Sequence, residues 1–388
     1  MSGVQVGLGR LAENPALVRG RRVALLCNQA AVTEQLEPAW ELLPRLGAQL
    51  VRIFAPEHGL FGLAQDMEAV GSESFAGVPV VSLYGQSPES LHPAPEALAD
   101  LEALVVDLPD IGCRYYTFAA TMAYCLGACQ QAGVEVIVCD RPNPLGGELL
   151  EGGPVEEGYR SFVSELPVPV RHGMTLGELS LLLQRERYPN AAVTVLTCQG
   201  WQRHQWWDET GLPWVAPSPN MPTLATATVY PGACLVEATN LSEGRGTTRP
   251  FLLTGAPWLD GQALARRLNA LELPGVRFRF TMFRPEFQKY AGQVCSGVEW
   301  HVTHRLGFRP LACGLVVLRE IRKLHPEHFA WRSEPYEFVA DVPAIDLLTG
   351  SPQARLVVEG KLSLEEVISG WETYSREFEL LRRPFLLA

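Results

Sequence analysis

The chain has 388 residues, of which 47% are hydrophobic and 19% charged, and its formal net charge is −11. This composition is typical of a folded enzyme and excludes a largely disordered chain. The acidic balance, without any cluster of lysines and arginines, excludes a nucleic-acid binder. No apolar run reaches the ~20 residues that a membrane helix needs, so no membrane insertion is expected.

The nine cysteines are dispersed through apolar segments such as Ala24-Leu25-Leu26-Cys27. An odd number in such surroundings indicates buried free thiols in a reducing compartment. The segment Met1–Gly7 shows no basic region followed by an apolar stretch, so no signal peptide is predicted. Together these features favour a cytoplasmic location.

In the first half of the chain, short apolar runs alternate with helical patterns. Buried strands are predicted at residues 22–28, 50–56, 103–109 and 135–142, and further strands at 78–84 and 193–198. Helices are predicted at 34–46, 117–132 and 175–187, the last opening with the capping box Thr175-x-x-Glu178. The alternation predicts a doubly wound, mostly parallel α/β sheet.

The pattern changes after about Tyr230. A helix is predicted at 255–271 with Asp260 as its N-cap, followed by a strand at 276–283 and by apolar segments at 298–303 and 315–318. Residues 343–362 resemble a loop that leads to a final helix pair. We therefore expect an α/β domain at 1–228 and a smaller α+β domain at 229–388, with the boundary in residues 225–232.

Polar side chains follow four of the predicted strands, at the edge where open parallel sheets bind ligands. They are Asn28, Glu57 with His58, Asp107 with Asp110, and Asp140 with Asn143. Each acid taken alone is also explained as a helix cap or turn former, and that alternative stays open. Together they predict one acidic cleft.

Glu57 is the leading candidate for a catalytic residue. Pro56 stiffens the end of the strand, and Gly59 and Gly62 permit a tight loop, so Glu57 should project into the cleft. A glutamic acid between apolar neighbours tends toward a raised pKa, as a general acid requires. The alternative is a loop anchor bonded to backbone amides.

Further candidates lie in four segments. In residues 107–116, Asp107 and Asp110 are interpreted as a base, as groups that position water, or as partners of Arg114, and Tyr116 as a hydrogen-bonding group or a stacking surface for a sugar ring. Arg171, beside His172 at a predicted helix start, suits a carboxylate ligand. Asn220 lies in a rigid polar loop, and residues 240–250, with Asn240, Glu243 and Arg245, suit recognition of an anionic group.

Other signals are weak. His301-x-x-His304 lacks the spacing of two zinc ligands on a helix, and no glycine-rich nucleotide fingerprint, Walker A motif or Gly-x-Ser-x-Gly elbow is present. Neither a metal nor a cofactor is therefore expected.

Several motifs resemble the NamZ-type exo-β-N-acetylmuramidase family, formerly a family of unknown function. The matching stretches are PEHG at 56–59, DLPDIGCRYYT at 107–117, DRPNP at 140–144, RHGMT at 171–175, DETGLPWVAPSPNM at 208–221, YPG at 230–232, TNLSEGRGTTRPF at 239–251 and KYAG at 289–292. The sequence departs from the family pattern at Phe61, Pro109 and Gln293.

The resemblance implies a Rossmann-like N-terminal domain that carries the acids and a smaller C-terminal domain that closes the cleft. It implies hydrolysis of terminal non-reducing β-linked N-acetylmuramic acid in peptidoglycan fragments, with Glu57 as the leading catalytic glutamate and Glu68 as a candidate second carboxylate. An arginine should hold the lactyl carboxylate of this sugar, and the candidates are Arg114, Arg171 and Arg245.

Two other functions stay open at this point. One is a metal-dependent hydrolase that uses Glu57, His58, Asp107 and Asp140 around a cation. The other is a muropeptide-binding protein without catalytic activity.

Overall fold

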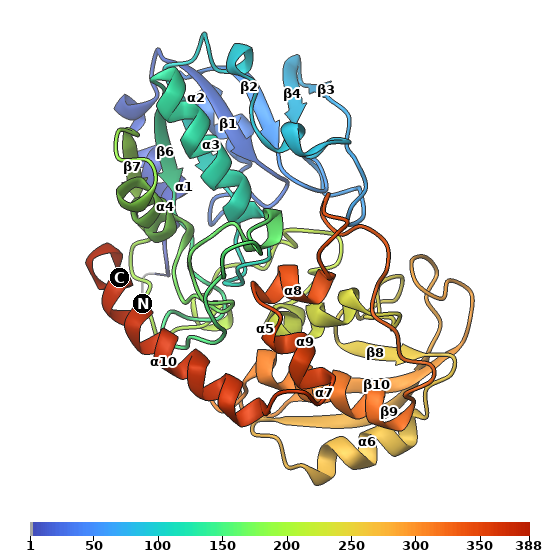
Figure 1. Ribbon diagram of the computed structural model, residues 1–388. Helices are drawn as coiled ribbons and strands as arrows, with labels where there is room; N and C mark the ends of the chain where they lie inside the picture. Colours follow the sequence, from blue (N-terminus) through green and yellow to red (C-terminus); the bar gives the residue numbers. More distant parts are fainter. Residues whose placement is uncertain (1–2) are drawn as a thin grey trace.

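The computed structural model describes residues 3–388; Met1 and Ser2, where the N-terminal segment considered above begins, lie outside the described residues. A larger part is built on a seven-stranded sheet, and a smaller part on a three-stranded antiparallel sheet (Figure 1). Across residues 3–388, no helix combines the length and apolarity that crossing a membrane requires.

The larger sheet confirms the predicted α/β class. Its strands are β1 (Arg22–Cys27), β2 (Gln49–Ala55), β3 (Glu73–Phe75), β4 (Val78–Ser82), β5 (Ala103–Asp107), β6 (Glu135–Cys139) and β7 (Val193–Leu196). They lie in the order β3-β4-β2-β1-β5-β6-β7, and all neighbours are parallel except β3 and β4. When β3 is left out, the order is that of the Rossmann fold. In this fold, ligands bind beyond the carboxyl ends of the strands, at the point where the strand order changes direction, here between β1 and β5.

Helices cover both faces of this sheet. α1 (Gly7–Glu13) and α2 (Ala39–Arg45) share a hydrophobic cluster with Leu25 and Ile137, whereas α3 (Phe118–Ala132) and α4 (Leu176–Glu186) share another with Leu26 and Val136. Neighbouring residues of one strand thus face opposite layers, as a doubly wound sheet requires. The capping box at Thr175 is present as predicted. α2 begins later than predicted, because its N-cap is Pro38.

The smaller part contains α5 (Leu224–Ala233), β8 (Leu253–Ala256), α6 (Gly261–Ala270), β9 (Val276–Phe283), β10 (Cys295–Val302) and α7 (Pro310–Leu324). The strand order is β8-β10-β9. Asp260 is the N-cap of α6, as predicted. The predicted start of that helix at Gly255 is wrong, because Gly255 pairs with Gly297 in the sheet.

The last segment differs most from the prediction. Residues 343–362 form α8 (Ala344–Thr349) and α9 (Gln353–Val358) instead of a loop, and the predicted final helix pair is one helix, α10 (Leu364–Arg382), followed by a 3₁₀ turn. Leu347 and Val357 are buried, so tertiary packing stabilises these short helices. α10 brings the chain back to the larger part (Figure 1), where Arg382 donates a 2.7 Å hydrogen bond to the carbonyl of Gly173.

The predicted domain boundary falls inside α5. One continuous hydrophobic cluster contains Val229 of this helix, Leu104 of the large sheet and Trp300 of the small sheet. The two parts therefore share core side chains, and the division at residue 228 stays a prediction.

Candidate active site

A cavity lies where loops of the two parts meet, and the space that it leaves for water-sized molecules is about 30 Å³. Four carboxyl groups line it: Glu57 and Asp66 from the segment after β2, Glu237 after α5, and Glu337 between α7 and α8. The acidic cleft expected from the sequence exists, but most of its acids come from other segments than the strand ends.

Glu57 follows β2 and Pro56 and faces this cavity, with only 5% of its surface exposed. The hydroxyl of Thr117 donates a 2.6 Å hydrogen bond to its Oε2, and the amide of Met67 lies 3.4 Å from its Oε1. Next to it, His58 has a φ of +73°, and its Nδ1 lies 3.0 Å from the carbonyl oxygen of Ala64. Both oxygens of Glu57 thus accept hydrogen bonds from groups that hold the side chain in the cavity.

Arg245 is the arginine of the cavity wall. Its guanidinium lies 2.5 Å from Glu237, 3.1 Å from Asp66 and 3.3 Å from Glu243. Lys289 adds a 3.1 Å ion pair with Glu243. Buried Arg245 and half-buried Lys289 thus compensate three carboxylates. Burial acts to raise the pKa of Glu243, but the charges of Lys289 and then of Arg245 hold it below its ordinary value.

Glu337 lies among different neighbours. The hydroxyl of Tyr84 donates a 2.9 Å hydrogen bond to its Oε2, and no cation forms an ion pair with it among residues 3–388. Burial, followed by the charge of Glu57, raises the pKa of Glu337 well above its ordinary value.

Aromatic and neutral polar groups complete the wall. Tyr115, Tyr116, Tyr230 and Phe251 supply ring surfaces of the kind on which sugars stack. The hydroxyl of Tyr116 is buried without a hydrogen-bond partner among the described residues. A buried polar group without a partner is costly, so this phenol is available to a ligand.

The predicted acids at the end of β5 do not line the cavity. Asp107 is fully buried and forms a bidentate pair with Arg141, at 2.5 and 2.8 Å. Asp110 accepts a 2.6 Å hydrogen bond from the amide of Gly112 and lies 3.4 Å from Nε2 of His172. These contacts position the loop before α3. Asp107 is a salt-bridge residue and Asp110 a turn residue, which are the structural roles that the sequence had left open as alternatives.

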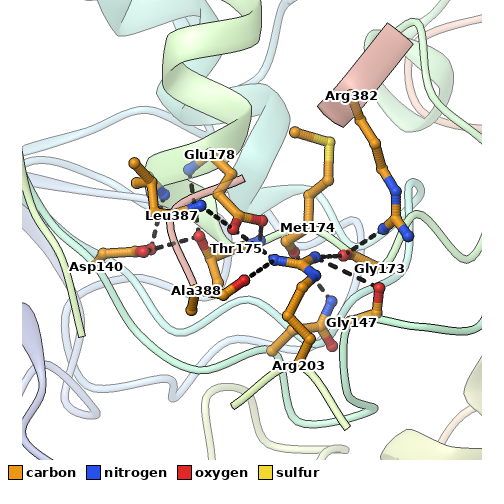
Figure 2. Close-up of polar contacts among 12 residues, drawn as sticks. Asp140, Gly147, Gly173, Met174, Thr175, Glu178, Arg203, Arg382, Leu387 and Ala388 are labelled. Atoms are coloured by element: carbon orange, nitrogen blue, oxygen red, sulfur yellow. Dashed lines mark hydrogen bonds and ion pairs between the residues drawn. The ribbon is translucent and has the colours of Figure 1, made fainter. Parts of the chain in front are cut away.

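The polar residues after β1 and β6 also bond to the backbone. Asn28 donates to the carbonyl of Pro217 at 2.8 Å, and Asn143 to that of Met174 at 3.0 Å. Figure 2 shows Asp140 beside Thr175; it accepts hydrogen bonds from that hydroxyl and from the amide of Gly177, at 2.8 and 2.7 Å. Asn143 and Asp140 thus hold the start of α4, whereas Asn28 holds the loop at Pro217, and none of the three lines the cavity.

Two of the three arginines proposed for the lactyl carboxylate are structural. Arg114 is completely buried and donates to the carbonyls of Gly153, Val168 and Thr349. Arg171 donates to the carbonyl of Leu145. Burial lowers the pKa of each to about 10. Both guanidinium groups thus bind main-chain oxygens away from the cavity.

The remaining candidates divide in the same way. Tyr116, Asn220 and Arg245 line the cavity, together with Glu57 and His58. His172 and Asn240 bond to nearby backbone groups, and Glu243 reaches the cavity only through Arg245. Glu68 is exposed and accepts a hydrogen bond from the amide of Gln65, so the acid of this loop that faces the cavity is Asp66.

The residues considered for a cation site are not brought together. Asp107 and Asp140 bond to Arg141 and Thr175, whereas Glu57 and His58 face the cavity. Over residues 3–388, no group of three or more His, Cys, Asp or Glu side chains has an arrangement that suits a metal ion.

Sequence reasoning missed Asp66, Thr117, Glu237, Tyr336 and Glu337. Thr117 closes the long motif DLPDIGCRYYT, which could have drawn attention to it. Asp66 is two positions from Glu68, and only the loop conformation selects between them. Glu237 and Glu337 stand in segments without a local pattern, so nothing in the sequence marked them.

A Rossmann-type sheet, a smaller second part and a cavity lined by several carboxyl groups suit a glycoside hydrolase, since the cleavage of a glycosidic bond usually uses carboxyl groups. The family described as exo-beta-N-acetylmuramidase NamZ matches nearly the whole chain, its N-terminal part at residues 23–225 and its C-terminal part at 228–387. The chain therefore belongs to the NamZ family of exo-β-N-acetylmuramidases.

Individual relatives agree. The peptidoglycan beta-N-acetylmuramidase NamZ of Bacillus subtilis (strain 168) is 40% identical, over 99% of this chain and 91% of its own length. Two crystal structures of DUF1343 family proteins from Bacteroides fragilis NCTC 9343 have similar folds. One has a TM-score of 0.89 at 32% identity over 99% of this chain and 98% of its own. The other has a TM-score of 0.75 at 26% identity over 100% and 99%.

Proposed function

We propose that this chain releases terminal β-linked N-acetylmuramic acid from the non-reducing ends of peptidoglycan fragments, with Glu57 as a catalytic carboxyl group. The observation that carries the proposal is the position of Glu57 in a cavity that three further carboxyl groups also line, beside the phenol of Tyr116, which has no hydrogen-bond partner within residues 3–388. Glycoside hydrolysis usually requires two carboxyl groups beside the scissile bond. The family membership supports the choice of sugar.

The substrate carries a carboxylate of its own, on its lactyl ether. Of the arginines that the sequence suggested, Arg245 lines the cavity, and it already contacts Glu237 and Asp66. We infer that Arg245 offsets the charge of these acids, so that an anionic sugar can enter an acidic cavity.

The test compares the wild type with Glu57→Gln on a chromogenic β-N-acetylmuramic acid glycoside and on the corresponding N-acetylglucosamine glycoside. The wild type should release the dye from the first substrate and not from the second, and Glu57→Gln should be roughly 10²–10⁴-fold slower. Glu41→Gln, an exchange of an exposed glutamate on α2, is the control and should keep wild-type activity. Near-normal turnover by Glu57→Gln would reject the role of Glu57.

The same assay separates an enzyme from a muropeptide-binding protein, because binding without release of dye would identify the latter. We also propose that the protein works in a reducing compartment, the cytoplasm. The support is that all nine cysteines are free and eight of them buried. Alkylation of the native protein should label Cys198 first, and a disulfide in protein isolated from cells under acid quench would contradict this location.

A further inference from the structure

Glu337 reaches the cavity on a tight turn of unusual conformation. Tyr336 and Val339 exchange two backbone hydrogen bonds of 2.9 Å, and the two residues between them, Glu337 and Phe338, have φ angles of +46° and +68°. Turns of this shape normally take asparagine and glycine, because side chains disfavour the left-handed region. Such strain persists where the surroundings hold the residues in place, and it is concentrated at functional sites.

Three successive side chains hold this turn at the cavity. Tyr336 donates a 2.7 Å hydrogen bond to Glu237, and the ring of Phe338 lies 5.6 Å from that of Tyr84. Tyr84 in turn donates to Oε2 of Glu337. This is the one hydrogen bond that the Glu337 carboxyl group makes within residues 3–388, so its Oε1 is left for a ligand.

The four carboxyl groups of the cavity fall into two kinds. Asp66 and Glu237 share the charge of Arg245, and Glu57 accepts hydrogen bonds from Thr117 and Met67. Within residues 3–388, Glu337 has neither a cation nor a second hydrogen-bond donor. A buried carboxyl group in that position retains its proton, since ionisation would place an uncompensated charge beside Glu57. The raised pKa of Glu337, due first to burial and then to Glu57, with smaller effects of Glu237 and Asp66, agrees with this argument.

We propose that Glu337 is the proton donor of the reaction and that Glu57 is the carboxyl group that acts with it, an assignment that rests on the proposed hydrolysis of β-linked N-acetylmuramic acid. The carboxylic acid of Glu337 gives its proton to the glycosidic oxygen as the bond from that oxygen to the anomeric carbon breaks. Glu57 faces the positive charge that develops at this carbon. One water is consumed: its hydroxyl group goes to the anomeric carbon, and its proton restores the acid on Glu337.

This assignment moves the acid role from Glu57, where the sequence placed it, to a residue of the second part. Two environments that push the protonation of neighbouring carboxyl groups apart are the usual basis for an acid and its partner. Since the two groups come from different parts of the fold, the complete pair exists only when those parts are together.

The experiment uses two substrates that differ in their need for acid. In the natural disaccharide the leaving oxygen belongs to a sugar and must be protonated, whereas in a dinitrophenyl glycoside it leaves unaided. Glu337→Gln should cleave the disaccharide roughly 10²–10⁴-fold more slowly than the wild type and the dinitrophenyl glycoside within about tenfold of it. For Glu337→Gln with the dinitrophenyl glycoside, the pH profile of the rate should lack the fall on its alkaline side. Glu57→Gln should lose both activities.

Glu334→Gln, an exposed glutamate of the same connecting segment, is the matched control and should behave as wild type. Should Glu337→Gln not fold, as judged by circular dichroism, Glu337→Asp keeps a carboxyl group and should show the same selective loss in weaker form. Equal rates of wild type and Glu337→Gln on the disaccharide, or equal losses on both substrates, would overturn the assignment. A wild type that releases no N-acetylmuramic acid from either substrate would instead reject the proposed function.

Discussion

The hydroxyl of Thr117, the N-cap of α3, donates a 2.6 Å hydrogen bond to Oε2 of Glu57 at the end of β2. The bond connects the first turn of a helix on the sheet to the carboxyl group of the cavity, and it ties the side chain of Glu57 to a rigid element. A hydrogen bond to a charged group contributes about 1.5–3 kcal/mol.

Thr117→Val should therefore lower kcat on the chromogenic glycoside by about 10- to 100-fold, with a smaller change in KM, because the shape is kept and the donor is lost. Thr117→Ser, which keeps the hydroxyl, should restore most of the rate. A Thr117→Val enzyme with unchanged kcat would show that this hydrogen bond does not position Glu57 for catalysis.

Replacement of Arg245 should affect the stability of the protein more than its affinity for the substrate. Its replacement by alanine would leave Glu237, Asp66 and Glu243 without their shared cation in a buried site. We expect Arg245→Ala to lower the free energy of unfolding by about 3–5 kcal/mol in urea titrations. Arg266→Ala on the exposed face of α6 should change it by less than about 0.5 kcal/mol. A fully stable Arg245→Ala protein that only binds substrate more weakly would contradict this view of the cluster.

The loop after Glu57 provides a paired comparison of two neighbouring acids. Asp66 contacts Arg245 at 3.1 Å and accepts a 2.8 Å hydrogen bond from Gln288, whereas Glu68 is exposed. Asp66→Ala should release the loop, raise KM by roughly tenfold and speed amide hydrogen exchange at residues 60–72. Glu68→Ala should leave kcat and KM within about twofold of wild type. The opposite ranking would restore Glu68 as the second carboxylate.

Asp140 should make stability depend on pH. Burial, the first cause, raises the pKa of Asp140 to about 7 in the folded protein, against about 3.9 in an unfolded chain. Between these values the folded state holds a proton that the unfolded state has released, so the contribution of Asp140 to stability falls as the pH rises from about 4 to about 7.

Asp140→Asn cannot ionise and should lack this decline. The difference in Tm between wild type and variant should therefore shift in favour of the variant from about pH 4.5 to about pH 8. Parallel Tm curves over this range would show that the carboxyl group of Asp140 does not titrate there.

Much of the fold could be predicted from the sequence because its signals are local. The six predicted strands of the large sheet are short, rich in β-branched residues and bounded by turn residues. Thr175 and Asp260 are N-cap residues that indicate where their helices begin. Where the signal was tertiary, prediction failed: α8 and α9 are too short to show a helical period and form because Leu347 and Val357 are packed.

The site was predictable only in part, for a related reason. The sequence places Asp107 and Asp140 at the carboxyl ends of strands, but it does not show what each side chain contacts. Asp107 bonds to Arg141 and Asp140 to Thr175, whereas Glu57 faces the cavity. Glu337 escapes prediction altogether, since its position follows from how a distant turn packs on Tyr84.

α10 has a mechanical consequence. The polypeptide passes from the larger part to the smaller one through α5, and after α10 it is fastened to the larger part again by Arg382 at Gly173 and by Leu387 at Glu178 (Figure 2). Two segments, α5 and α10, therefore connect the larger and the smaller part. Any movement of one part against the other must accommodate both connecting segments, and it would also disturb the core side chains that the two parts share.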